Sequence, residues 1–119
     1  MLDLVGTFGG FPGDIPVVGG WTGDGKTKVG IFRNGEWHLD LSGTAQYNPA
    51  TDLTGRFGSP GDIPVIGDWT GSGTSKVGVY RGGVWYLDLN GNVQWDGPAV
   101  DRAGGFGVPT DVPLVGRWN

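Results

Sequence analysis

The chain of 119 residues contains no cysteine and a single histidine, His38. Without cysteine the chain has no disulfide bond and no thiolate that could act as a nucleophile or metal ligand. A hydrolytic triad combines a nucleophile, a base and a group that orients the base, and the sequence shows no such set around its one histidine. We therefore expect no enzymatic activity from this chain.

Positive charge and long apolar runs are also scarce. Lys and Arg number 8 against 12 Asp and Glu, which gives a formal net charge of −4. No basic patch of the kind that binds nucleic acid is visible. No apolar run approaches the ~20 residues of a membrane-spanning helix, and residues 1–20 lack the charged and apolar regions of a signal peptide. We expect neither nucleic acid nor a membrane as a partner.

Glycine and proline, in contrast, are abundant, at 26 and 8 residues. In a chain without a period, such a composition indicates disorder. Here the chain also contains 6 Trp, 5 Phe and 3 Tyr, and disordered chains are poor in such residues. Because the glycines and prolines recur at fixed positions, they predict turns between short strands.

An internal repeat organises the sequence. The motif Asp-Ile-Pro-Val at 14–17 returns at 62–65, and as Asp-Val-Pro-Leu at 111–114, with offsets of 48 and 49 residues. Residues 14–43 and 62–91 align without gaps and are identical at 19 of 30 positions. The chain is therefore one repeat unit, 1–119, with two full copies and the start of a third, at 12–58, 59–107 and 108–119.

Each period contains four short strands separated by glycine-rich breaks. Two of these breaks are two to three residues long, the length of tight hairpin turns. In the third strand Trp85 and Leu87 share one face and Tyr86 and Asp88 the other, which is the period of a β-strand. In the second copy the predicted strands are 63–69, 76–81, 84–89 and 93–95, followed by a long connection at 96–109.

The expected fold is all-β, because no segment carries a helical period. A four-stranded antiparallel unit of this length has the size of a β-propeller blade. One blade cannot bury both of its faces alone, so it needs neighbouring blades.

The residues of the second copy resemble a known family. The stretch Phe-Gly-Ser-Pro-Gly-Asp-Ile-Pro-Val-Ile-Gly-Asp-Trp-Thr-Gly at 57–71, with Lys-Val-Gly-Val-Tyr-Arg at 76–81, resembles the FG-GAP or VCBS-type repeats of bacterial proteins. These repeats are similar to the blades of the integrin α-subunit propeller. The resemblance covers nearly the whole chain and implies a propeller of about seven blades. It also implies a place outside the cell or at its surface, in adhesion, ligand binding or as an accessory module of an enzyme.

The resemblance further implies a calcium loop after the first strand, in which alternating carboxylates bind the ion. Here only Asp24 and Asp68 remain as carboxylates in the two loops, and the last acidic position is Lys28 or Lys76. In the third copy Arg117 fills the first acidic position. We therefore expect no calcium and no other cofactor. An alternative role for the two lysines is to hold each loop by donating to backbone carbonyls or to the remaining Asp.

The tryptophans of the third strand allow two interpretations. Aromatic rings bury large areas, so they can form the core between adjacent blades. A partly exposed ring can instead stack on a pyranose while polar neighbours bind its hydroxyl groups. The candidate carbohydrate-binding residues are Trp37, Trp85, His38, Tyr86, Asp40 and Asp88.

Aspartates that recur with the repeat favour a structural role. Asp40 and Asp88 are a candidate carboxylate pair of a glycosidase, but their recurrence favours bonds to backbone amides of the next turn. Asp14, Asp62 and Asp111 each precede an apolar residue and Pro, where Asp stabilises turns by bonding nearby amides.

The predicted blades leave edges and faces open. Open strand edges favour aggregation, and a closed cyclic oligomer removes them. Two blades per chain predict a homotrimer of six blades or a homotetramer of eight. An extra first strand at 112–118 is either displaced or pairs across a subunit boundary. The expected function is a self-assembling structural or binding module, with a carbohydrate-binding propeller lectin or an accessory domain of a secreted enzyme as alternatives.

Overall fold

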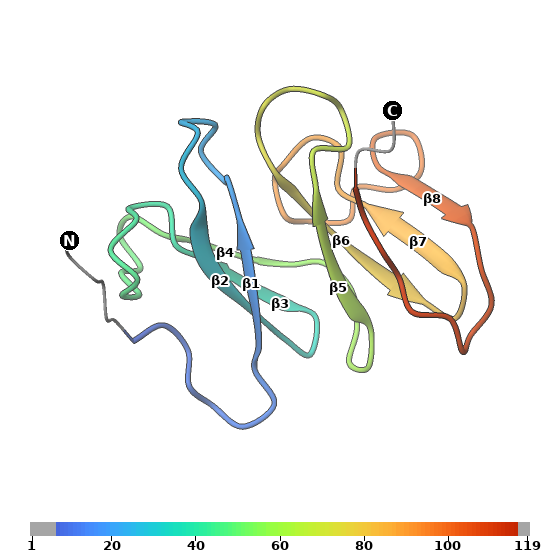
Figure 1. The fold of residues 1–119 in the computed structure, drawn as a ribbon, viewed down its shortest axis with the longest axis horizontal. Helices are drawn as coiled ribbons and strands as arrows, with labels where there is room; N and C mark the ends of the chain where they lie inside the picture. The colour runs from blue at the N-terminus through green and yellow to red at the C-terminus, as the bar shows by residue number, and fades with distance from the viewer. Residues whose placement is uncertain (1–6, 117–119) are drawn as a thin grey trace.

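The computed structural model describes residues 7–116 (Figure 1). They form eight β-strands in two four-stranded antiparallel sheets and contain no helix, which confirms the predicted all-β class. Over these residues there is accordingly no helix of the length and apolarity that crossing a membrane requires. Arg117 and Trp118, which the sequence assigns to the third copy, lie outside the described residues.

The two sheets have the same strand order and equivalent registers. In both sheets, strands that follow one another in the sequence are neighbours, and each pair is antiparallel. The first sheet contains β1 (Ile15–Gly19), β2 (Lys28–Arg33), β3 (Glu36–Leu39) and β4 (Leu53–Arg56). The second sheet contains β5 (Ile63–Gly67), β6 (Lys76–Arg81), β7 (Val84–Leu87) and β8 (Arg102–Gly105).

The central hairpin of each sheet turns over two residues with positive φ. Asn34 and Gly35 have φ of 51° and 92°, and Gly82 and Gly83 have φ of 57° and 93°. A two-residue turn with both φ values positive matches the right-handed twist of the flanking strands. These turns therefore set the registers in which Arg33 faces Glu36 and Arg81 faces Val84.

The predicted fourth strand at 93–95 is wrong. The fourth strand of the second sheet is β8, which pairs with β7 and lies within the segment predicted to be a connection. Its sequence, Arg-Ala-Gly-Gly, has neither the β-branched residues nor the alternation that mark a strand. Val93 instead has φ of 56°, and Gln94 makes a single parallel bridge to Arg56 at the end of β4.

Three other predicted boundaries differ from the structure. The first strand of the second sheet ends at Gly67, before Trp69, and the third ends at Leu87, before the turn held by Asp88. The extra strand predicted from 112 onward is not formed over residues 112–116. Val112, Pro113 and Val115 instead line a groove with residues of β1 and β5, without forming a hydrogen-bonded ladder with either strand.

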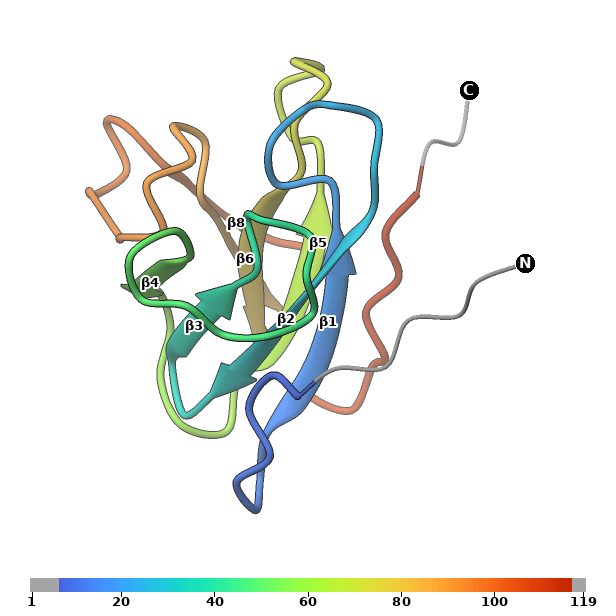
Figure 2. The ribbon, with the colours of Figure 1, turned by 90° about the vertical axis from the view of Figure 1, so that its left-hand side faces the viewer.

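The sheets pack against each other, with β1 and β5 side by side (Figures 1 and 2). The space between them holds the main apolar core. Two hydrogen bonds also cross the junction. The Ser75 amide donates to the Gly20 carbonyl, and the Gly20 amide donates to the Ser75 hydroxyl. The core residues are Val17, Trp21, Phe32, Trp37, Leu39 and Phe57 from the first half of the chain, and Val77, Val79 and Val93 from the second half.

Candidate functional site

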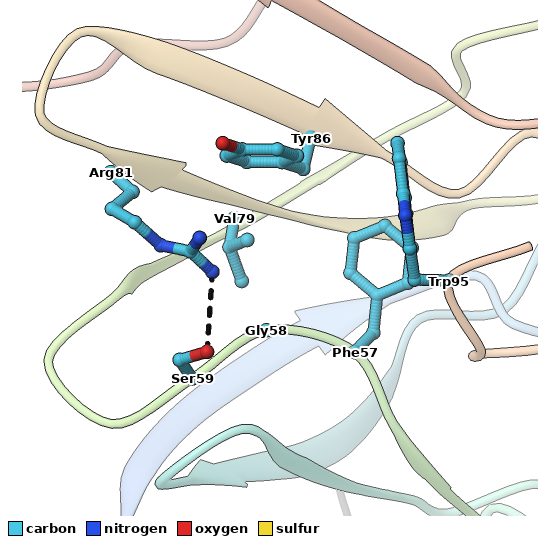
Figure 3. A pocket seen from close by; sticks show the side chains of 7 residues that line it. All are labelled: Phe57, Gly58, Ser59, Val79, Arg81, Tyr86 and Trp95. Carbon is cyan, nitrogen blue, oxygen red and sulfur yellow. Dashed lines mark hydrogen bonds between the residues drawn. The ribbon is translucent and has the colours of Figure 1, made fainter. Parts of the chain in front are cut away.

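A small pocket opens between the second sheet and the segment that leads out of β4 (Figure 3). Its volume is about 210 Å³. Pockets for drug-sized ligands span roughly 300–1,000 Å³, so this one suits a single ring. The lining residues are Phe57, Gly58, Ser59, Val79, Arg81, Tyr86 and Trp95.

Three aromatic rings form one side of the pocket. The ring of Trp95 lies 5.6 Å from that of Tyr86 and 5.9 Å from that of Phe57, both edge to face. Trp95 remains 41% exposed, whereas Phe57 is buried. The edge-to-face contacts fix the indole while leaving part of it open to a ligand.

Arg81 supplies the polar side of the pocket (Figure 3). Its Nε and Nη2 each donate to the buried Asp62 carboxylate at 2.7 Å, and Nη2 also donates to the Ser59 hydroxyl at 3.3 Å. The guanidinium lies 4.8 Å from the centre of the Tyr86 ring. The hydrogen bonds to the Asp62 carboxylate raise the pKa of Arg81, which favours the charged guanidinium.

The first sheet has an equivalent arrangement with one further contact. Arg33 Nη2 donates to Asp14 at 3.0 Å, and Phe8 lies 5.6 Å from Tyr47, as Phe57 does near Trp95. There, however, the Arg33 guanidinium lies 4.4 Å from the ring of Phe11. The second copy has one residue fewer before its Asp and no counterpart of Phe11, so its arginine stays open on this side.

The predicted tryptophans occupy different environments. Trp37 is fully buried between the sheets, and its indole N–H donates to the Phe57 carbonyl at 2.8 Å. Trp85 holds the equivalent position in β7, is half-buried, and donates to the Phe106 carbonyl at 3.0 Å. Trp37 thus has the predicted core role, while Trp85 lies on the open face of the second sheet.

Tyr86 is the one predicted site residue that lines the pocket. His38 is its equivalent in β3, with its ring 5.7 Å from Tyr47. His38 Nδ1 lies 3.3 Å from the Thr54 hydroxyl, and Nε2 lies 3.4 Å from Glu36 without hydrogen-bond geometry. The structure therefore does not bring the six predicted residues together in one site.

Asp40 and Asp88 are buried at the ends of β3 and β7. Asp40 accepts from the amides of Gly43 and Ala45, at 3.1 and 2.8 Å. Asp88 accepts from the amides of Gly91 and Val93, at 3.2 and 2.9 Å. The hypothesis that these aspartates bind amides of the next turn is confirmed.

The two carboxyl groups differ in their pKa values. Burial opposes ionisation of Asp40, but the amide of Ala45 and the hydroxyl of Ser42 outweigh it and lower the pKa. Burial raises the pKa of Asp88, and the nearby Asp101 carboxylate adds to this rise. Ionised Asp40 therefore stabilises its turn more effectively than ionised Asp88 does.

The aspartates of the recurring motif also bind amides, as predicted. Asp14 accepts from Phe11 at 3.0 Å, and Asp62 accepts from Ser59 at 2.8 Å. Asp111 accepts from Val108 at 2.8 Å. Each carboxylate therefore closes the turn that precedes it.

The ammonium groups of two buried lysines occupy the loops that follow β1 and β5. Lys28 Nζ donates to Thr22 and Asp24, at 2.9 and 2.8 Å, and lowers the pKa of Asp24 to about 2. In the second loop, Lys76 Nζ donates to the Ser72 hydroxyl at 2.7 Å and the Thr74 carbonyl at 3.3 Å.

These contacts show how the lysines relate to the calcium loops implied by the family resemblance. Lys76 lies 4.0 Å from Asp68, which instead accepts the amides of Ser72 and Gly73. Over residues 7–116, no group of three or more His, Cys, Asp or Glu is arranged to hold a metal ion. A cationic ammonium among the loop oxygens does not fit a calcium site.

Sequence reasoning missed most of the pocket. Phe57, Trp95 and Arg81 are separated along the chain, and their meeting depends on how the two sheets pack. One signal was present, since Arg33 and Arg81 recur at the same place in both copies, 19 residues after a recurring Asp. A recurring spacing of opposite charges predicts a cross-strand ion pair.

No protein-family model, curated protein or solved structure matches this chain. The class that the structure defines is an all-β protein of two packed, four-stranded antiparallel sheets. The resemblance to FG-GAP and VCBS-type repeats accordingly depends on the residues of the chain itself.

Proposed function

We propose that the chain is a non-catalytic, β-propeller-type module that assembles with copies of itself. In this proposal each sheet is a blade, and the junction between the two sheets is repeated between chains. One observation carries it, namely the contrast between Phe57 and Phe106, the residues that follow β4 and β8.

Phe57 and Phe106 hold equivalent positions and differ in burial. Phe57 is 1% exposed and packs against Trp95, in the loop that joins β7 and β8 of the following sheet. Phe106 is 83% exposed, and no sheet within residues 7–116 follows to cover it. A first sheet from a second chain offers Tyr47, the equivalent of Trp95, as a partner for Phe106.

Other apolar residues of the segment that follows Phe106 are also open. Val112 and Leu114 are largely exposed, and Val108 is exposed as well. Exposed apolar patches on a protein surface often mark an interaction site. A head-to-tail contact that covers this patch forms a ring if the rotation between sheets closes, and six sheets from three chains or eight from four are the proposed sizes.

Native mass spectrometry over a range of concentrations tests the assembly. We expect a discrete trimer or tetramer for the unmodified chain and a shift toward monomer for Phe106→Ser. Val100→Ser is the control, because Val100 is an exposed apolar residue in the loop before β8. A folded monomer at every concentration contradicts the proposal.

Carbohydrate binding is a second candidate, favoured by the pocket of Trp95, Tyr86 and Arg81. The apolar face of a pyranose can stack on the exposed part of the Trp95 indole, and the Arg81 guanidinium can donate hydrogen bonds to the hydroxyl groups of the sugar. A fluorescence titration with neutral monosaccharides tests this, with Trp95→Ala expected to abolish the signal. Tyr47→Ala, the matched change on the first sheet, where Phe11 lies over Arg33, should leave it intact, and equal loss in both variants contradicts a site at Trp95.

A further inference from the structure

We propose that assembly proceeds by segment exchange, in which residues 106–114 of one chain replace residues 8–17 on the first sheet of another. This inference depends on the proposed self-assembly and names the surfaces that it uses. We call residues 8–14, 57–62 and 106–111 the docking segments, because each begins with Phe-Gly and ends with Asp.

The middle docking segment shows how such a segment binds a sheet. Phe57 packs against Trp95, and Asp62 forms a two-point ion pair with Arg81 of β6. Both contacts lie on the second sheet, whereas the segment continues from β4 of the first. The docking segment is therefore the connection that fastens one sheet to the next.

The N-terminal docking segment makes the same two contacts with the first sheet. Phe8 lies 5.6 Å from Tyr47, edge to face, and Asp14 pairs with both Nε and Nη2 of Arg33 in β2. The chain thus occupies its own first sheet with a segment equivalent to the one that fastens the second.

The C-terminal docking segment has the same chemistry, but within residues 7–116 no further sheet follows it. Phe106 is the most exposed large apolar side chain of the described residues. Asp111 accepts the amide of Val108, and no arginine within residues 7–116 pairs with it. The segment therefore carries both of the groups that Tyr47 and Arg33 bind.

Two docking segments consequently compete for one position. Each first sheet has a single Tyr47 and a single Arg33, and both are engaged by the chain's own residues 8–14. A neighbouring chain can place Phe106 and Asp111 there only after that segment leaves. Since residues 112–114 align with residues 15–17 of β1, the exchange extends naturally into the first strand.

The N-terminal docking segment has one contact that its competitor lacks. The ring of Phe11 lies 4.4 Å from the Arg33 guanidinium, and residues 106–111 contain no second aromatic residue. This contact favours the chain's own segment and so opposes exchange. Removing it should therefore strengthen assembly rather than weaken it.

The decisive experiment compares Phe11→Ser with Phe106→Ser by native mass spectrometry. A cation–π contact at an exposed site corresponds to about a 2- to 5-fold change in an equilibrium constant. We expect Phe11→Ser to lower the concentration at which the oligomer half-dissociates by about this factor, and Phe106→Ser to raise it. Asp14→Asn, which weakens the same segment at Arg33, should act in the same direction as Phe11→Ser.

A thiol cross-link tests the contact between chains. A side chain at Gly55 of β4 would touch Val93 across the existing junction, and the equivalent pair between chains is Gly104 with Ala45. A Cβ added at Gly104 would meet no atom within 4 Å. Because the chain has no cysteine, the double variant Gly104→Cys/Ala45→Cys should oxidise to closed oligomers, and each single variant to dimers at most.

The outcomes separate the exchange from the assembly that it presupposes. If Phe11→Ser and Asp14→Asn weaken assembly or leave it unchanged while the chain still forms discrete oligomers, exchange is wrong and assembly stands. If neither the unmodified chain nor any variant forms oligomers or closed cross-linked species, both proposals fail. A melting curve for each variant confirms that the two sheets remain folded.

Discussion

Lys76 organises the loop between β5 and β6 through its ammonium group. The group is buried and donates to two hydroxyl groups and the Thr74 carbonyl. Lys76→Met keeps most of the apolar stem but leaves these acceptors without a donor, so we expect the free energy of unfolding to fall by about 1–3 kcal/mol. Urea denaturation measures the change, and Lys26→Met, at an exposed position, should stay within about 0.5 kcal/mol.

Asp24 and Lys28 make the stability depend on pH. The pKa of Asp24 is lowered from its ordinary 3.8 to about 2, chiefly by the hydrogen bond from Lys28. A carboxyl group with a lowered pKa stabilises the folded state above its unfolded pKa and loses this contribution as pH falls through its folded value. We expect stability to decrease between about pH 4 and pH 2, and less steeply in Lys28→Met.

Urea denaturation at several pH values checks this expectation. Asp14 contributes in the same direction, because Arg33 lowers its pKa. Asp88 contributes in the opposite direction, because burial raises its pKa and the folded state then favours the protonated form. A slope in Lys28→Met equal to that of the unmodified chain would show that the Asp24 pair does not affect stability.

At the level of elements, the two-residue turns of the central hairpins differ by one residue, Asn34 against Gly82. Gly82 has φ of 57° and open space around it. Asn tolerates this conformation and restricts the unfolded chain, so Gly82→Asn should raise the free energy of unfolding by about 0.4–1 kcal/mol.

Gly35→Ala should lower the free energy of unfolding by about 1–3 kcal/mol, because φ is 92° and the new Cβ would lie 2.6 Å from the Gly58 carbonyl oxygen. Thermal melting distinguishes the two signs, and a neutral Gly35→Ala would contradict the turn geometry.

The first three strands of each sheet could be predicted because their signals are local. Apolar alternation and glycine turns mark β6 and β7, and the observed strands begin where the sequence places them. The fourth strand of the second sheet has no local signal, since Arg102–Gly105 lacks β-branched residues and apolar alternation and is exposed throughout. This strand forms because its backbone pairs with the free edge of β7. That contact is non-local, so the residues of the strand do not signal it.

At the scale of the whole molecule, burial depends on which sheet comes next. Phe57 and Phe106 occupy equivalent positions of the repeat, so the sequence does not distinguish them. Which of them is covered follows from packing between sheets. The pocket likewise depends on this packing, since its residues come from the segment after β4 and from β6, β7 and the loop that follows.

Trp37 and Trp85 also hold equivalent positions and differ in burial. One indole is sealed between the sheets, the other lies on the open face, and both donate to the carbonyl of an equivalent phenylalanine. In a symmetric ring the two side chains would have nearly the same surroundings. With fluorine-labelled tryptophan, the two fluorine resonances should be well separated in a single chain. They should converge if the chains form the proposed ring, so the internal duplication supplies a reference within the same molecule.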